Sequence, residues 1–191
     1  IDAGIAWGWI DITRVRTDKN IDISGSLTYI SPDDKNPSDQ TVFTITLPEV
    51  VQPGDTVRLY LDFVTKLPKI VARSGYSRNF YFAGQWFPKI GVYENEGERG
   101  RETGGWNCHQ YHSKSEFFAD FGVYNVDINV PNDFMVASGG KLLDKKALED
   151  NTTTWFFRAE DILDFAWTTS NRFKVVKANW GKVEIEVFLQ P

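Results

Sequence analysis

Two histidines and the single cysteine lie close together in residues 107–112 (Asn-Cys-His-Gln-Tyr-His), and Glu116 follows them. Imidazole nitrogen, thiolate sulfur and carboxylate oxygen are the ligands that zinc accepts in proteins. In an extended segment, however, residues three apart point to opposite faces, so His109 and His112 could not easily meet at one ion. We therefore expect no metal in this chain and interpret both histidines as hydrogen-bonding side chains at a surface or interface.

Nucleophilic chemistry has equally little support. Cys108 stands next to His109, but catalytic Cys–His pairs meet across a fold, and no helix N-terminus is predicted that could lower the thiol pKa. The residues Ser138-Gly139-Gly140 lack the strand–turn–helix context of a nucleophile elbow. No glycine-rich phosphate-binding motif is present. The sequence therefore predicts no self-sufficient active site.

Carboxylates gather in two places. Those of the glycine- and charge-rich segment 94–105 are expected to be solvated in a surface loop. Asp161 and Asp164 could flank a site, but turn and capping roles are commoner for such residues. The acidic residues of the charged segment are Glu94, Glu96, Glu98 and Glu102.

The most unusual segment is aromatic: residues 80–89 read FYFAGQWFPK. Flat rings beside amides suit carbohydrate recognition, and Trp7, Trp9 and Trp106 add to the supply of flat rings. The same residues also suit a sandwich core next to an interface, because interfaces are enriched in Trp, Tyr and Phe. On composition alone the second interpretation is preferred.

Composition and net charge exclude several classes of protein. The chain has 191 residues, with 41% hydrophobic and 25% charged residues, which favours one folded domain over disorder. Its net charge of −5 argues against nucleic acid as a partner, because such binding needs a basic surface. No run reaches the roughly 18–20 apolar residues of a membrane-spanning helix. Cys108 alone forms no internal disulfide and leaves the compartment open, with an extracytoplasmic location preferred.

Alternation with a period of two dominates the sequence and predicts strands at 43–47, 57–63, 126–130 and 183–189. Each run places its apolar residues on one face, which is typical of a sheet with one buried and one wetter side. Polar, Pro- and Gly-containing turns separate the runs. Residues 141–150 fit a short helix or a hairpin. We expect an all-β domain over 1–191: a two-sheet, β-sandwich-like, mostly antiparallel fold with little helix.

Several segments together resemble the aminopeptidase N family of zinc metallopeptidases, of bacterial type, whose relatives include leukotriene A hydrolase. The resemblance runs in order from about residue 47 to 173 and so covers most of the chain. The segments that carry it are 50–55 (VVQPGD) with 67–68 (LP), 84–93 (GQWFPKIGVY), 105–106 (GW) with 116–126 (EFFADFGVYNV), 130–131 (VP) with 138–140 (SGG), and 164–167 (DFAW).

The resemblance is to the family's N-terminal saddle-shaped β domain only. It implies that the family's first strands precede Ile1 and that a thermolysin-like catalytic domain, which would hold zinc on its HExxH motif, follows Pro191. No cofactor is implied for this chain. The family's β domain packs on its own catalytic domain, closes part of the cleft and helps to bind the free α-amino group of the peptide. Gln85 is the candidate for that role, supported by Tyr81 and Trp86.

The resemblance thus implies a substrate-capping domain that is itself inactive. Two alternatives remain: a freestanding carbohydrate- or protein-binding module, and a relative without catalysis that serves as a scaffold. An excised capping domain should expose a broad apolar patch, whereas a carbohydrate module should show a short row of aromatic rings.

Overall fold

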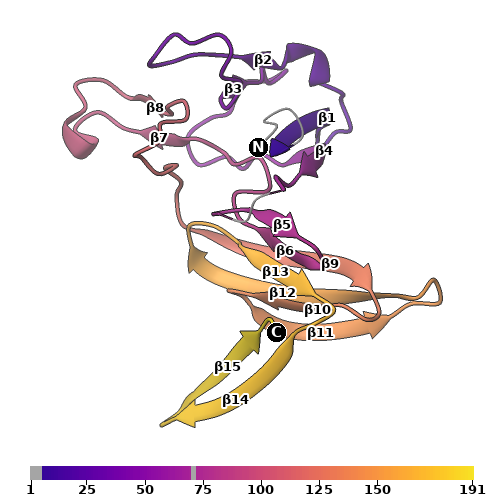
Figure 1. The fold of residues 1–191 in the computed structure, drawn as a ribbon. Helices are drawn as coiled ribbons and strands as arrows, with labels where there is room; N and C mark the ends of the chain where they lie inside the picture. The colour runs from indigo at the N-terminus through magenta and orange to yellow at the C-terminus, as the bar shows by residue number, and fades with distance from the viewer. Residues whose placement is uncertain (1–5, 70–71) are drawn as a thin grey trace. The chain divides into compact units, whose positions relative to one another are not determined.

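The computed structural model describes residues 6–69 and 72–191 (Figure 1). Nearly half of the chain, 46%, is strand and 4% is helix, and the strands pair antiparallel. The predicted all-β, sandwich-like class is therefore confirmed. Among the described residues, no helix is both long and apolar enough to cross a membrane.

The chain folds as two compact units that alternate along the sequence. The first comprises Ile1–Trp9, Thr65–Trp86 and Phe121–Pro191, and the second comprises Ile10–Val64 and Phe87–Asp120. Both units thus draw on separate stretches of sequence. The prediction of a single domain over 1–191 stays a prediction, and the expectation about strands before Ile1 concerns residues outside the described part.

The first unit contains a four-stranded sheet in the order β10-β13-β6-β5. Its strands are β5 (Gly75–Ser77), β6 (Phe80–Ala83), β10 (Met135–Ser138) and β13 (Trp167–Ser170). Central β13 pairs with β6 and β10 on its two sides, so segments more than 80 residues apart form one sheet. This long-range pairing brings the aromatic segment around residue 81 next to residues 167–170.

The second sheet of this unit has the order β11-β12-β9. It consists of β9 (Gly122–Pro131), β11 (Lys141–Ala147) and β12 (Thr152–Ile162). Period-two alternation buries one face, as the sequence predicts: Ile128 and Val130 of β9 are buried, as are Trp155, Phe157 and Ala159 of β12. Residues 141–150 form a strand and turn of a hairpin, which decides between the two structures that the sequence allowed.

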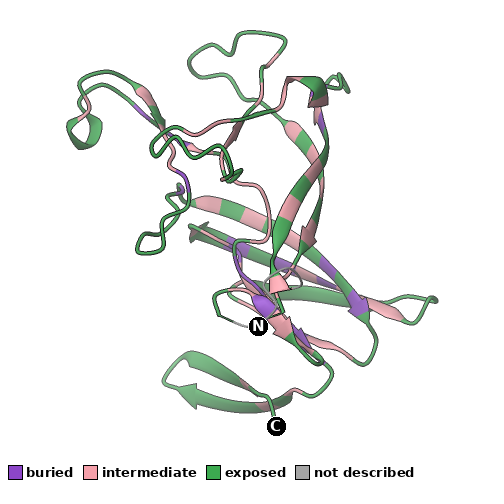
Figure 2. Cartoon of the chain, turned by 45° about the horizontal axis from the view of Figure 1, so that its top comes forward, coloured by how far each residue is buried: buried purple, intermediate pink, exposed green. Residues whose placement is uncertain are grey.

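Phe165 lies in the link between β12 and β13 and is fully buried. Its ring lies 6.2 Å from that of Phe157 on β12 and 6.3 Å from that of Tyr124 on β9 (centroid to centroid). The two sheets thus give a sandwich-like arrangement with an aromatic core. Buried positions of the first unit gather on these strands (Figure 2).

A hairpin of β14 (Lys174–Trp180) and β15 (Val183–Leu189) completes the first unit. The strand predicted at 183–189 is confirmed at both ends. Its apolar face, however, is exposed, because no described residue of this unit covers it (Figure 2).

The second unit is poorer in regular structure. A ribbon of β1 (Trp9–Thr17) and β4 (Leu59–Lys66) is its longest element. Burial alternates along β4, as the sequence predicts, although the strand begins at Leu59 rather than at residue 57. Val15 on β1 is fully buried.

Short pairs make up the rest of this unit. They are β2 (Thr28–Tyr29) with β3 (Phe43–Thr44), and β7 (Val92–Glu94) with β8 (Gly105–Asn107). The strand predicted at 43–47 therefore has only its first two residues in regular pairing. The two 3-10 turns, η1 (Ser24–Ser26) and η2 (Glu98–Gly100), also belong to this unit.

Candidate functional site

The turn that follows β6 carries Gln85, the residue that the family resemblance suggests for substrate binding. Gln85 is exposed and has a backbone φ of 51°, in the left-handed region that non-glycine residues seldom adopt. Preceding Gly84 is packed so closely that a Cβ atom would lie 2.7 Å from the carbonyl oxygen of Arg73. Close packing at Gly84 and the positive φ of Gln85 thus fix the backbone conformation of the turn, in which Gln85 is exposed.

Side-chain and backbone bonds join this turn to the segment before β13. The backbone N–H of Gln85 donates to Oδ2 of Asp164 at 3.4 Å, and the indole N–H of Trp86 donates to the carbonyl oxygen of Phe165 at 2.8 Å. The ring of Trp86 also meets that of Trp167 edge to face, with centroids 6.2 Å apart. The GQWFPK and DFAW segments, far apart in sequence, therefore meet in space.

Tyr81 lies on β6 itself and is half-buried. Its ring stacks on Tyr76, with centroids 5.7 Å apart and planes 17° from parallel, and it lies 6.2 Å from Phe134. Of the three predicted site residues, Gln85 is therefore the exposed one, whereas Tyr81 and half-buried Trp86 are packed against other aromatic rings. Such packing suits a supporting role better than direct contact with a ligand.

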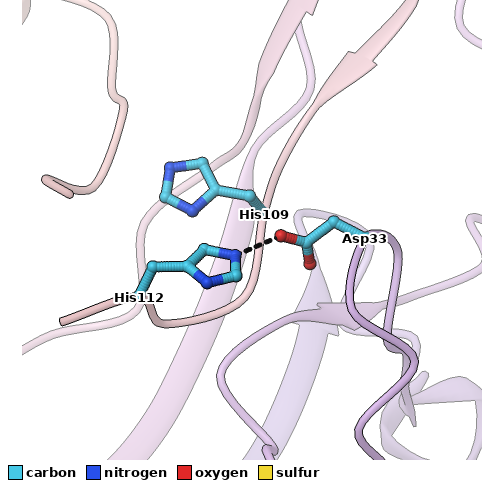
Figure 3. A group of neighbouring side chains, drawn as sticks. All are labelled: Asp33, His109 and His112. Atoms are coloured by element: carbon cyan, nitrogen blue, oxygen red, sulfur yellow. Dashed lines mark hydrogen bonds and ion pairs between the residues drawn. The ribbon is translucent and has the colours of Figure 1, made fainter. Parts of the chain in front are cut away.

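The second unit brings His109 and His112 together with Asp33 (Figure 3). One ligand atom from each lies within 4.8 Å of the others, and the two imidazole centroids are 5.9 Å apart. The expectation that the two rings cannot meet is wrong, because residues 108–121 form an irregular segment and not a strand. The third member is Asp33 and not Glu116, which sequence proximity suggested.

Hydrogen bonds that involve side chains hold this cluster in place. Gln110 is fully buried between the two histidines; its N–H donates to Oδ1 of Asp33 at 3.0 Å, and its Nε2 donates to the carbonyl oxygen of Asn36 at 3.0 Å. Nε2 of His112 shares a hydrogen bond with Oδ2 of Asp33. This bond and the Gln110 N–H lower the pKa of Asp33 to about 2, and the same carboxylate raises the pKa of His112.

Cys108 takes no part in the cluster. Its thiol packs so closely against Gly91 that a side chain at position 91 would collide with Sγ. Burial raises the pKa of the thiol, which disfavours the thiolate that nucleophilic attack requires. Both observations support the sequence-based interpretation that Cys108 is not a nucleophile.

Glu94 is not the solvated carboxylate that the sequence suggests. It ends β7 with only 3% of its side chain exposed, and it accepts bonds from Arg99 at 2.8 Å, Arg101 at 2.6 Å and Asn107 at 2.9 Å. These donors, Arg99 foremost, lower the pKa of Glu94 to about 2. Charged segment 94–105 is therefore folded back on a buried carboxylate. The two arginines that follow Glu94 in sequence, Arg99 and Arg101, are the signal from which this pairing could have been predicted.

Comparison with known proteins assigns no family. No family model matches the chain, and no curated protein matches it. The resemblance described above therefore rests on the quoted segments themselves, two of which the fold places in contact through Trp86 and Phe165.

The Trp86 contact gives a first prediction. Trp86→Phe keeps an aromatic ring but removes the donor to the Phe165 carbonyl, and we expect it to lower the free energy of unfolding by about 1 kcal/mol. Urea denaturation measures this change. Trp106→Phe is the matched control, because 61% of the Trp106 side chain is exposed. Equal losses in both variants would contradict a structural role for the Trp86 indole.

The Glu94 cluster gives a second prediction. Glu94→Gln leaves two arginines beside a neutral amide, and we expect a lower urea midpoint at pH 7. In the native chain Glu94 ionises with a pKa of about 2 against an ordinary 4.5, so its stabilisation is complete above pH 4.5 and is lost as the pH falls towards 2. The variant cannot titrate at this position, so its stability should fall less over that range. The control is Glu96→Gln at an exposed position; an identical pH profile in both variants would refute the assignment.

Proposed function

We propose that this chain is the non-catalytic N-terminal β domain of a zinc aminopeptidase of the aminopeptidase N family. Its role is to cap the active-site cleft and to bind the free α-amino group of the peptide. Catalysis and zinc belong to a downstream catalytic domain, and the partner of this chain is that domain. The ordered set of motif segments and the all-β architecture support this proposal.

The observation that carries the proposal is the exposed apolar face of the β14–β15 hairpin. The register places Val176 opposite Val187, Ala178 opposite Ile185, and Trp180 opposite Val183 on one face. Trp180 is 78% exposed. The opposite face carries the Lys177–Glu186 ion pair.

An apolar sheet face of this kind calls for a partner surface. A two-stranded hairpin is marginally stable on its own, and contiguous exposed apolar patches mark interaction sites. The face is mostly aliphatic and follows a regular strand register, so it suits burial against a folded domain. A capping domain that packs on its catalytic domain requires such a surface.

The carbohydrate-binding alternative finds less support. The exposed rings of Trp106 and Tyr93 lie 5.4 Å apart on the β7–β8 hairpin, but their planes are 85° apart. Perpendicular rings do not form the flat row on which a sugar chain stacks. The arrangement is typical of edge-to-face packing between aromatic neighbours.

Gln85 is the residue proposed to bind the peptide amine. An ammonium group that leaves bulk water needs oxygen acceptors, and the amide oxygen of a glutamine supplies one. The bonds of the turn to Asp164 and Phe165 hold the backbone on both sides of this exposed side chain. Because the backbone at this position is already held in place, less entropy is lost when the side chain binds its ligand.

Kinetics of the full-length parent enzyme test this role. Gln85→Gly removes the amide without strain at the positive φ, which an alanine would not tolerate as well. Loss of a hydrogen bond to a charged group should lower kcat/KM for aminoacyl anilides by about 10- to 100-fold.

Two controls sharpen the kinetic test. Gln85→Glu places a carboxylate at the same position and should retain or increase kcat/KM, because an anion attracts the ammonium more strongly. Gln52→Gly removes an exposed glutamine from another turn and should leave the kinetics unchanged. If Gln85→Gly keeps the kcat/KM of the parent, Gln85 does not bind the amine.

The exposed apolar face of the β14–β15 hairpin, which is proposed to dock on the catalytic domain, gives a separate prediction. Val187→Thr keeps a β-branched side chain but makes the exposed face more polar, so its effect on the isolated chain should stay within about 0.5 kcal/mol. In the full-length parent the same change should lower the Tm, because the face is buried there. Val57→Thr, at an exposed valine outside this hairpin, is the control. An equal effect of Val187→Thr in the isolated chain and in the parent would exclude this face as the docking surface.

A further inference from the structure

Asp33, His109 and His112 form the densest group of metal-ligating side chains in the described part of the chain. Figure 3 shows the two imidazoles and the carboxylate turned toward one another, from two segments more than 70 residues apart. We propose that these three residues bind a divalent transition-metal ion, with zinc the ion that suits them best. The inference goes beyond the proposed function and does not rest on it, since any catalytic zinc would lie in another domain.

The donor set is the first argument. Two imidazole nitrogens and one carboxylate oxygen match the ligands of zinc sites that keep a coordination position open to water. The same set also suits other first-row ions, among which affinity rises towards Cu²⁺. Calcium and magnesium are disfavoured, because they prefer oxygen ligands alone.

The second argument is that the site is held together by hydrogen bonds in which the histidine side chains take no part. The buried Gln110 joins the segment to Asp33 and Asn36, and the N–H of Tyr111 donates to Oδ2 of Asp39 at 3.1 Å. These bonds hold the two segments together through backbone groups. The imidazoles therefore lie close to the carboxylate whether or not they make bonds themselves.

The ring of His109 is positioned by a contact from outside the cluster, since it is parallel to that of Phe117 within 4°, at 6.4 Å between centroids. The nitrogen of His109 that faces Asp33 and His112 is Nδ1 (Figure 3). Because Nδ1 also lies 2.7 Å from the carbonyl oxygen of Gln110, the ion replaces this hydrogen bond.

Charge near the site favours a cation. Asp34 and Asp39 lie near enough to His112 to act on its ring electrostatically, in addition to Asp33 itself. With neutral imidazoles, the only formal charge of the three ligands is the negative charge of Asp33. A divalent ion would therefore leave one net positive charge at the site, and the carboxylates of Asp34 and Asp39 lower the energy of that charge.

The three ligand atoms need to move only a little closer together to bind one ion. Tetrahedral zinc with ligands at about 2.0 Å sets the ligand atoms about 3.3 Å apart, compared with separations of up to 4.8 Å here. Asp33 and His112 are exposed and His109 is half-buried, so rotation of the side chains can close the difference. The ion replaces the hydrogen bond between His112 and Asp33.

Titration of the 191-residue chain with Zn²⁺ tests the proposal directly. Calorimetry should give one ion per chain, and the Tm should rise with free zinc, because binding to the native state alone stabilises it. Co²⁺ should bind at the same site and give the visible absorption of a four- or five-coordinate ion with nitrogen ligands. Absence of stoichiometric zinc binding by the folded chain overturns the proposal.

Variants separate this site from non-specific binding. His109→Gln leaves the bond between Asp33 and Gln110 in place, and it should weaken zinc binding at least about 10-fold and abolish the cobalt spectrum. Asp34→Asn is the matched control, because it removes a neighbouring charge but no ligand and should change affinity much less. Circular dichroism without metal verifies that both variants fold. Equal affinity of His109→Gln and the native chain, or equal losses in both variants, overturns the assignment.

Discussion

The hydrogen bond from the indole of Trp86 to the carbonyl of Phe165 connects the elements on which the first unit depends. It joins the turn after β6 to the link between β12 and β13, and that link carries the fully buried Phe165 ring into the aromatic core. A buried carbonyl without a donor would be costly, and the indole supplies one without bringing a charge into the core. The same contact determines where Gln85 is displayed. Core packing and the candidate substrate-binding residue are therefore coupled through one bond.

Polar groups organise the second unit, because its strands are short. Buried Glu94 accepts hydrogen bonds from two arginines of the charged segment and from Asn107 on β8. Buried Gln110 joins residues separated by more than 70 positions. Each group is costly to bury alone, so the segments that satisfy it are held together. This provides an ordered scaffold where regular pairing is sparse. The histidine cluster lies on that scaffold.

The two units thus offer different chemistry. The first presents an apolar hairpin face and an exposed amide on a rigid turn, which suit packing against a domain and binding of an ammonium group. The second presents two imidazoles and a carboxylate in an acidic setting, which suit a cation. Burial raises the pKa of the Cys108 thiol, which disfavours the thiolate.

Local pattern was sufficient for the all-β class and for strands such as 126–130 and 183–189, because alternation with a period of two is a property of neighbouring residues. The family resemblance, and not local pattern, suggested Gln85, Tyr81 and Trp86, and their role in substrate binding stays a prediction. Local pattern failed where the outcome depends on how the chain folds back on itself. The donors of Glu94 lie only 5 to 13 residues away, but alternation does not reveal the turn that returns them to the carboxylate. The meeting of His109 with His112 follows from an irregular segment held by Asp33 and Asn36, which lie more than 70 positions away. Only tertiary structure decides such cases, because the free energy of a buried polar group depends on whether the fold brings its partners to it.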